Sequence, residues 1–120
     1  MVTQERRATP RMRVYHPVRV HQSGQTRIIE TLTKDLSEGG LCCLAPTALP
    51  VSSDVALELV LATGQAPLSV RGRTAWFRHI PQSEQFDVGI AFSEMSLPDK
   101  RRLSAYLERL SARPVFLLSV

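Results

Sequence analysis

The chain has 120 residues, of which 43% are hydrophobic and 22% are charged, and its formal net charge is +4. This length fits one domain with a modest core, and the composition is that of a folded globular protein, which excludes wholesale disorder. No apolar run approaches the roughly 20 residues that span a bilayer, and the N-terminus is charged where a secretory signal would be apolar, so we expect a cytoplasmic protein.

Arginines dominate the start of the chain. Arg6, Arg7 and Arg11 lie in residues 1–13, which we predict to form an N-terminal arm ahead of the folded domain. A guanidinium group can hold a phosphate or a guanine edge with two hydrogen bonds and can stack on a ring face. The arm therefore indicates binding of an anionic or guanine-containing ligand, and a solvated tail is the alternative interpretation.

The central part of the chain alternates between short apolar runs and turn residues. Val55, Leu57 and Leu59, for example, alternate with more polar positions, as in a strand with one buried face. Strands are expected near residues 14–20, 28–32, 41–44, 55–61, 68–77 and 86–92. Six strands at hairpin spacing predict an all-β fold, a six-stranded antiparallel β-barrel.

The period changes near the C-terminus. Leu103, Tyr106, Leu107 and Leu110 follow the spacing of an amphipathic helix. Ser96 and Asp99 form a start signal before it and Pro114 is expected to stop it, so the predicted domain of barrel and C-terminal α-helix covers residues 14–113. Residues 114–120 form an apolar tail that either packs back on the domain or offers a surface to a partner.

A polar turn is expected between the second and third strands, with Asp35, Ser37, Gly39 and Gly40. A carboxylate can accept hydrogen bonds from guanine N1–H and N2–H, and a hydroxyl can donate or accept one more. The glycines would allow positive φ and let the backbone approach a ligand. The alternative interpretation is that Asp35 and Ser37 only cap their own turn.

Catalytic and metal sites find little support in the sequence. The histidines and cysteines lack the paired spacing of a zinc site, so we predict no metal. No nucleophile-elbow or phosphate-loop pattern occurs, so we predict no catalytic residue, no enzyme activity and no cofactor. Cys42 and Cys43 are expected to divide between core and surface, and Trp76 is expected in the core.

Three motifs in this order resemble the PilZ-domain family of bacterial cyclic di-GMP receptors. They are Arg7-x-x-x-Arg11, Asp35-x-Ser37-x-x-Gly40 and Asp87-Val88-Gly89-Ile90-Ala91-Phe92. The resemblance implies a six-stranded β-barrel with a C-terminal helix and an arm that folds over the barrel mouth beside the turn. It also implies a set of residues that bind cyclic di-GMP, which are Arg6, Arg7, Arg11, Asp35, Ser37, Gly39 and Gly40.

The expected function is therefore a non-catalytic cyclic di-GMP receptor, in which binding orders the arm and relays the signal to a downstream protein that the sequence does not identify. A ligand-independent PilZ-like adaptor is the alternative. Basic β-barrels also bind single-stranded nucleic acids by stacking bases on aromatic residues, but only seven aromatic residues are present, so we expect no nucleic acid polymer as partner. We also expect no membrane insertion. The sequence leaves open whether the protein forms a homodimer and whether it binds one or two ligand molecules per chain.

Overall fold

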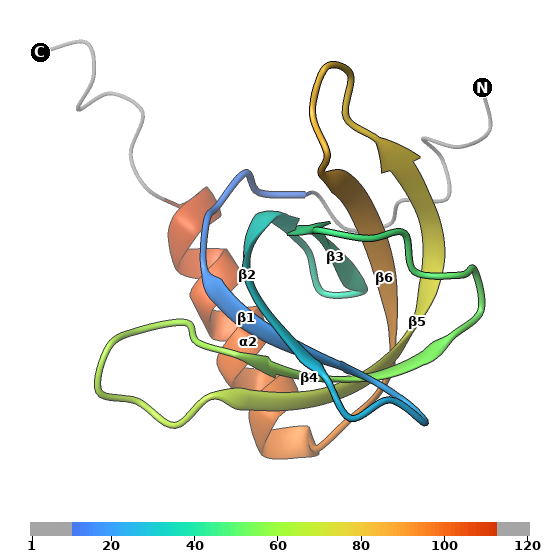
Figure 1. The fold of residues 1–120 in the computed structure, drawn as a ribbon. Helices are drawn as coiled ribbons and strands as arrows, with labels where there is room; N and C mark the ends of the chain where they lie inside the picture. The colour runs from blue at the N-terminus through green and yellow to red at the C-terminus, as the bar shows by residue number, and fades with distance from the viewer. Residues whose placement is uncertain (1–10, 113–120) are drawn as a thin grey trace, which may run out of the picture.

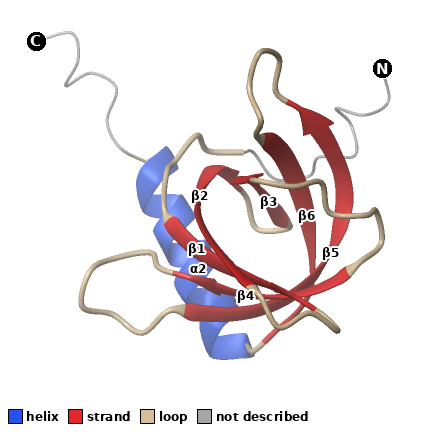
Figure 2. Ribbon diagram, in the orientation of Figure 1, coloured by secondary structure: helices blue, strands red, loops and turns tan. Residues whose placement is uncertain are grey.

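The computed structural model describes residues 11–112 and shows a closed antiparallel β-barrel followed by a helix (Figure 1, Figure 2). The strands neighbour one another in the order β1-β2-β3-β6-β5-β4, and β4 closes the barrel against β1. The elements are β1 (Pro17–Gln22), β2 (Ile28–Leu36), β3 (Gly40–Ala45), β4 (Asp54–Leu59), β5 (Leu68–His79), β6 (Phe86–Met95) and α2 (Leu97–Ser111). The predicted fold, a six-stranded antiparallel barrel with a C-terminal helix, is confirmed.

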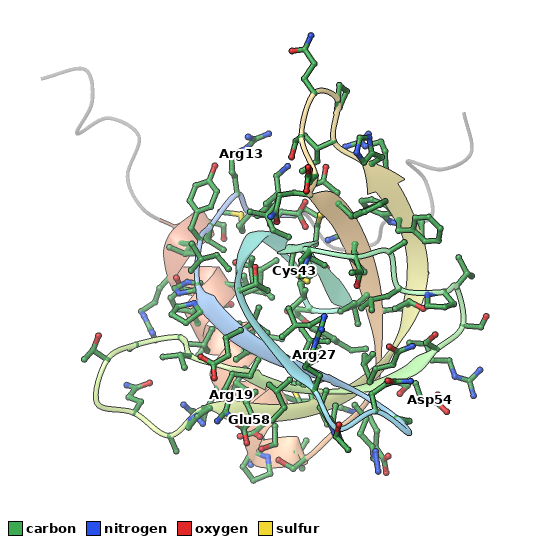
Figure 3. The ribbon with its side chains drawn as sticks, in the orientation of Figure 1. Arg13, Arg19, Arg27, Cys43, Asp54 and Glu58 are labelled. Atoms are coloured by element: carbon green, nitrogen blue, oxygen red, sulfur yellow. The ribbon has the colours of Figure 1, made fainter. Side chains whose placement is uncertain are left out.

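The barrel interior is filled by every second side chain of the strands, as strand geometry requires. Val18 and Val20 of β1 and Leu57 and Leu59 of β4 are at most 2% exposed. Cys43 points into the same interior, whereas Arg19 lies on the outer surface (Figure 3). The core is therefore a single apolar cluster, and the outer face of the strands is free for polar side chains.

Helix α2 packs against the barrel through Leu103 and Leu107, which join the apolar core. It begins after Ser96, whose hydroxyl accepts a hydrogen bond of 3.2 Å from the Asp99 backbone N–H, as the start signal predicted. Within residues 11–112, no helix combines the length and apolar character that a membrane span requires. The predicted stop at Pro114 and the apolar tail lie outside the described residues.

The strand limits differ from the predicted ones, and the differences at the ends of β2 and β5 bear on the site. β2 continues through Asp35 to Leu36, so Asp35 belongs to a strand and the turn begins after it. β5 continues to His79, because it stays paired with β6 beyond the barrel as a projecting hairpin (Figure 1). The outward face of β2 carries Ile28 and Leu32, which are 43% and 45% exposed.

Candidate functional site

The turn after β2 is held by its own hydrogen bonds. The Ser37 N–H donates to the Gly40 carbonyl at 2.9 Å, and the Ser37 hydroxyl accepts from the Gly39 N–H at 3.2 Å. The Ser37 hydroxyl also donates to the Gly40 carbonyl at 3.3 Å, and the residue is only 4% exposed. Ser37 therefore fixes the shape of the turn.

Gly40 is required by packing and not by backbone conformation. A Cβ atom at this position would lie 2.4 Å from the Ile90 carbonyl oxygen of β6, whereas one at Gly39 would meet nothing within 4 Å. The expectation that these glycines supply positive φ is wrong, because the glycines with positive φ are Gly24 and Gly64. Gly40 instead lets β3 lie directly against β6.

Arg11 and Asp35 form an ion pair, with 2.6 Å between Arg11 Nη1 and Asp35 Oδ1. The backbone supports this pair, because Met12 and Leu36 exchange two hydrogen bonds of 2.9 Å. The two side chains are 27% and 32% exposed, so both remain accessible from solvent. The structure thus brings together one arm residue and one residue of the second motif. Arg6 and Arg7 lie outside the described residues.

A row of residues crosses the outer face of the barrel from this ion pair. Asp35 of β2 pairs with Cys42 of β3, Cys42 pairs with Gly89 of β6, and Gly89 pairs with Trp76 of β5. Trp76 is 41% exposed, so its predicted place in the core is wrong. The cause is a shift in the pairing register between Thr74 and Trp76, which re-aims the strand, and the indole ring covers Gly89.

Next to this row lies a buried carboxylate with two basic partners. Asp87 is 3% exposed and accepts hydrogen bonds from Lys34 Nζ at 2.8 Å and from Arg78 Nη2 at 3.0 Å. Burial alone would raise the pKa of Asp87, but the hydrogen bonds and charges of Lys34 and Arg78 outweigh it and lower the pKa. The carboxylate is therefore ionised at neutral pH.

Arg78 and Lys34 were not singled out from the sequence. The Arg78 guanidinium carbon lies 5.9 Å from the centre of the Trp76 ring, within the range of a cation–π contact. Lys34 stands at a register shift between Thr33 and Asp35, which turns it toward Asp87. The sequence feature that could have pointed to them is Asp87, because a charged residue at the start of an otherwise apolar strand motif requires basic partners.

The two cysteines point to opposite faces of β3, and only Cys43 joins the core, but the expected surface exposure of Cys42 is wrong because both residues are buried. Burial first, and then the nearby Asp35 and Asp87 carboxylates, raise the pKa of Cys42 to about 11. Burial raises the pKa of Cys43 to about 12. Both thiols are neutral at physiological pH, and a neutral thiol is a poor nucleophile. Among residues 11–112, no three His, Cys, Asp or Glu side chains gather to hold a metal ion.

The turn also touches the helix. Glu38, at the second variable position of the motif, accepts a hydrogen bond of 3.0 Å from the Ser104 hydroxyl of α2. The segment after Arg11 approaches α2 as well, through a contact between the His16 ring and the Tyr106 hydroxyl. The candidate site is thus connected to the surface of α2 from two sides.

Comparison with known proteins agrees with this architecture. Residues 5–109 match the PilZ domain family, and no match was found among the curated proteins. The fold is similar to the Bacillus subtilis inhibitor of motility MotI/DgrA, with a TM-score of 0.74 and 20% identity over 90% of this chain and 53% of that one.

Two other similar structures contain cyclic di-GMP. The PilZ domain of Escherichia coli YcgR has a TM-score of 0.65 and 17% identity over 92% of this chain and 99% of that one. The K. pneumonia MrkH complex has a TM-score of 0.68 and 20% identity over 88% of this chain and 52% of that one. The chain thus spans about half the length of MotI/DgrA and MrkH. Because the family match covers most of the sequence, this chain belongs to the PilZ domain family.

Proposed function

We propose that this chain is a non-catalytic receptor for cyclic di-GMP that binds its ligand with Arg6, Arg7 and Arg11 of the arm and with the Asp35–Gly40 segment. The observation that carries the proposal is the partly exposed ion pair of Arg11 and Asp35, which joins the two polar motifs on one face. The family match and the presence of cyclic di-GMP in two similar structures support it.

The chemistry of the pair suits this ligand. Cyclic di-GMP presents two anionic phosphodiesters and two guanines. The Arg11 guanidinium can bind a phosphate or the guanine O6 and N7 atoms, and Asp35 can accept hydrogen bonds from guanine N1–H and N2–H. Ser37 is buried and bonded within its turn, so we assign it the role of holding the Asp35–Gly40 segment in shape.

The proposed relay starts from an arm that is anchored at Arg11 and Met12. Arg6 and Arg7 precede this anchor and would close over the ligand from the other side. Ordering of the arm costs conformational entropy, so arm order and ligand affinity rise together. The contacts of Glu38 with Ser104 and of His16 with Tyr106 offer a route from the site to α2, where an unidentified partner protein would detect the change.

The test is isothermal titration of the purified chain with cyclic di-GMP, with cyclic di-AMP and GTP as controls. Loss of a charge-assisted hydrogen bond costs about 1.5–3 kcal/mol, so Arg11→Ala and Arg7→Ala should each weaken binding about tenfold or more. Arg13→Ala is the matched control, because Arg13 is an exposed arginine two residues along the chain (Figure 3).

Two results would contradict the proposal. Unchanged affinity in the Arg7 and Arg11 variants would exclude binding by the arm. Absence of selective cyclic di-GMP binding by the natural sequence would exclude the receptor function and favour a ligand-independent adaptor.

A further inference from the structure

We propose that Arg78, oriented by Asp87, forms a second recognition pole that binds the other half of the cyclic dinucleotide, opposite the Arg11–Asp35 pole. This inference rests on the proposed function and extends the binding site from β2 across β3 and β6 to β5. The first observation is that both poles consist of an arginine bonded to an aspartate, at 2.6 Å for Arg11 and Asp35 and at 3.0 Å for Arg78 and Asp87.

The two poles lie on one face of the barrel. The row from Asp35 through Cys42 and Gly89 to Trp76 crosses three gaps between strands, which amounts to about 14 Å. Arg78 follows Trp76 by two residues, and side chains two positions apart point to the same face of a strand. Cys43 and Val88, the chain neighbours of the row, belong to the core cluster, and successive side chains of a strand alternate between faces, so the row and both poles face outward.

The exposure of the charged groups assigns their roles. The Asp87 side chain is only 4% exposed, so it positions its partners and does not reach a ligand. The Arg78 side chain is 70% exposed and one of its guanidinium nitrogens is bonded to Asp87, which fixes its direction. A guanidinium group has five N–H donors, and those that point to solvent can bind a phosphate or guanine O6 and N7.

The symmetry of the ligand explains why a second pole is needed. Cyclic di-GMP consists of two identical guanosine monophosphate halves, so its two ends present the same acceptors. The Arg11–Asp35 pair can serve one half, and a second arginine at the far end of the row can serve the other. Lys34 connects the two poles. It is the chain neighbour of Asp35 in the first pole, and its Nζ atom lies 2.8 Å from Asp87 Oδ1 in the second.

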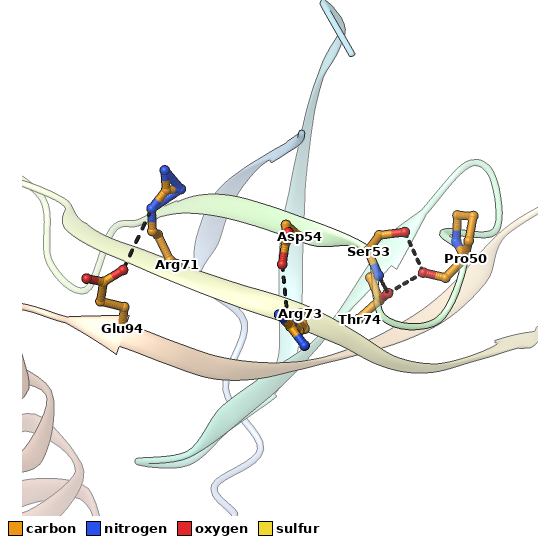
Figure 4. A network of polar contacts seen from close by, with 7 residues as sticks. All are labelled: Pro50, Ser53, Asp54, Arg71, Arg73, Thr74 and Glu94. Atoms are coloured by element: carbon orange, nitrogen blue, oxygen red, sulfur yellow. Dashed lines mark hydrogen bonds and ion pairs between the residues drawn. The ribbon is translucent and has the colours of Figure 1, made fainter. Parts of the chain in front are cut away.

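The experiment is titration of the full chain and of its Arg78→Ala variant with cyclic di-GMP. We expect Arg78→Ala to weaken binding about tenfold or more, as for the loss of other charge-assisted hydrogen bonds. Arg71→Ala is the matched control, because Arg71 is an exposed arginine on the same strand that pairs with Glu94 at 3.9 Å (Figure 4). Arg71 precedes Trp76 of the row by five residues along β5. This control should bind like the natural sequence.

A double-mutant cycle tests whether Asp87 acts through Arg78. Asp87→Asn should weaken binding in the natural sequence but have little further effect in the Arg78→Ala background, because coupled residues are not additive. A purely structural role of Asp87 would lower affinity equally in both backgrounds and would overturn its assignment as the positioning residue.

The outcomes separate the two proposals. Unchanged affinity in Arg78→Ala together with lost affinity in Arg11→Ala would refute the second pole and leave the receptor function intact. Absence of cyclic di-GMP binding by the natural sequence would refute the receptor function and the second pole together.

Discussion

Gly40 is the residue of the second motif whose role the structure explains most directly. Its hydrogen faces the Ile90 carbonyl, and a Cβ atom would lie 2.4 Å from that oxygen. Since the obstacle is backbone, Gly40→Ala forces β3 and β6 apart, and we expect a loss of about 1–3 kcal/mol in the free energy of unfolding. Urea denaturation monitored by circular dichroism measures this loss.

Gly39→Ala provides the control for that experiment. Gly39 does not have positive φ, and an added Cβ atom would meet nothing within 4 Å. A substitution of this kind usually changes stability by less than about 0.5 kcal/mol. Equal destabilisation by the two variants would show that Gly40 is not limited by its contact with β6.

At the level of single residues, the sequence named more residues of the first proposed pole than of the second. Arg11, Asp35 and Gly40 could be named because they occupy positions of short motifs. Arg78 and Lys34 could not be named, because their roles depend on which strands are neighbours and on two register shifts. Such shifts leave no regular spacing in the sequence.

At the level of elements, helix α2 depends on its N-terminal cap. The Ser96 hydroxyl accepts the Asp99 N–H, one of the backbone donors that have no partner within the helix. We expect Ser96→Ala to lower the free energy of unfolding by about 1 kcal/mol, and Ser96→Asp to preserve it because aspartate also caps well. Thermal unfolding of the three proteins checks this, and equal stability of the alanine variant would contradict the capping role.

The elements themselves were well predicted where one face is buried. β1 and β4 follow strict alternation, since their inward side chains enter the core and their outward ones do not. The ends of β2 and β5 were missed, because β2 stays paired with β3 and β5 with β6 past the point where alternation is visible. Trp76 was misplaced for a different reason, because its face is set by the register shift after Thr74 and not by hydrophobicity.

At the level of the whole molecule, a buried threonine links the arm to the barrel. The Thr33 hydroxyl donates to the Val14 carbonyl at 2.6 Å and accepts from the His16 N–H at 2.9 Å. Val14 and His16 lie between Met12, which pairs with Leu36, and β1. Thr33 is 0% exposed, so it cannot touch a ligand, and any effect on binding must pass through the position of the arm.

Thr33→Val removes both hydrogen bonds with little change of shape. We expect a loss of about 2 kcal/mol in stability, because the partly buried His16 N–H and Val14 carbonyl are left without these partners. We also expect faster amide exchange at Met12 and Leu36 and weaker cyclic di-GMP binding, since Arg11 would spend less time beside Asp35.

Thr74→Val supplies a control with the same chemistry on the far side of the barrel. The Thr74 hydroxyl bonds the Pro50 carbonyl and accepts from the Ser53 N–H at 3.0 Å, and the residue is 2% exposed (Figure 4). Thr74→Val should lower the free energy of unfolding to a similar extent. It should leave amide exchange at Met12 and the affinity for cyclic di-GMP unchanged, because the protein molecules that remain folded bind the ligand normally. If both valine variants changed exchange at Met12 and affinity equally, global stability would account for the effect, and Thr33 would not anchor the arm.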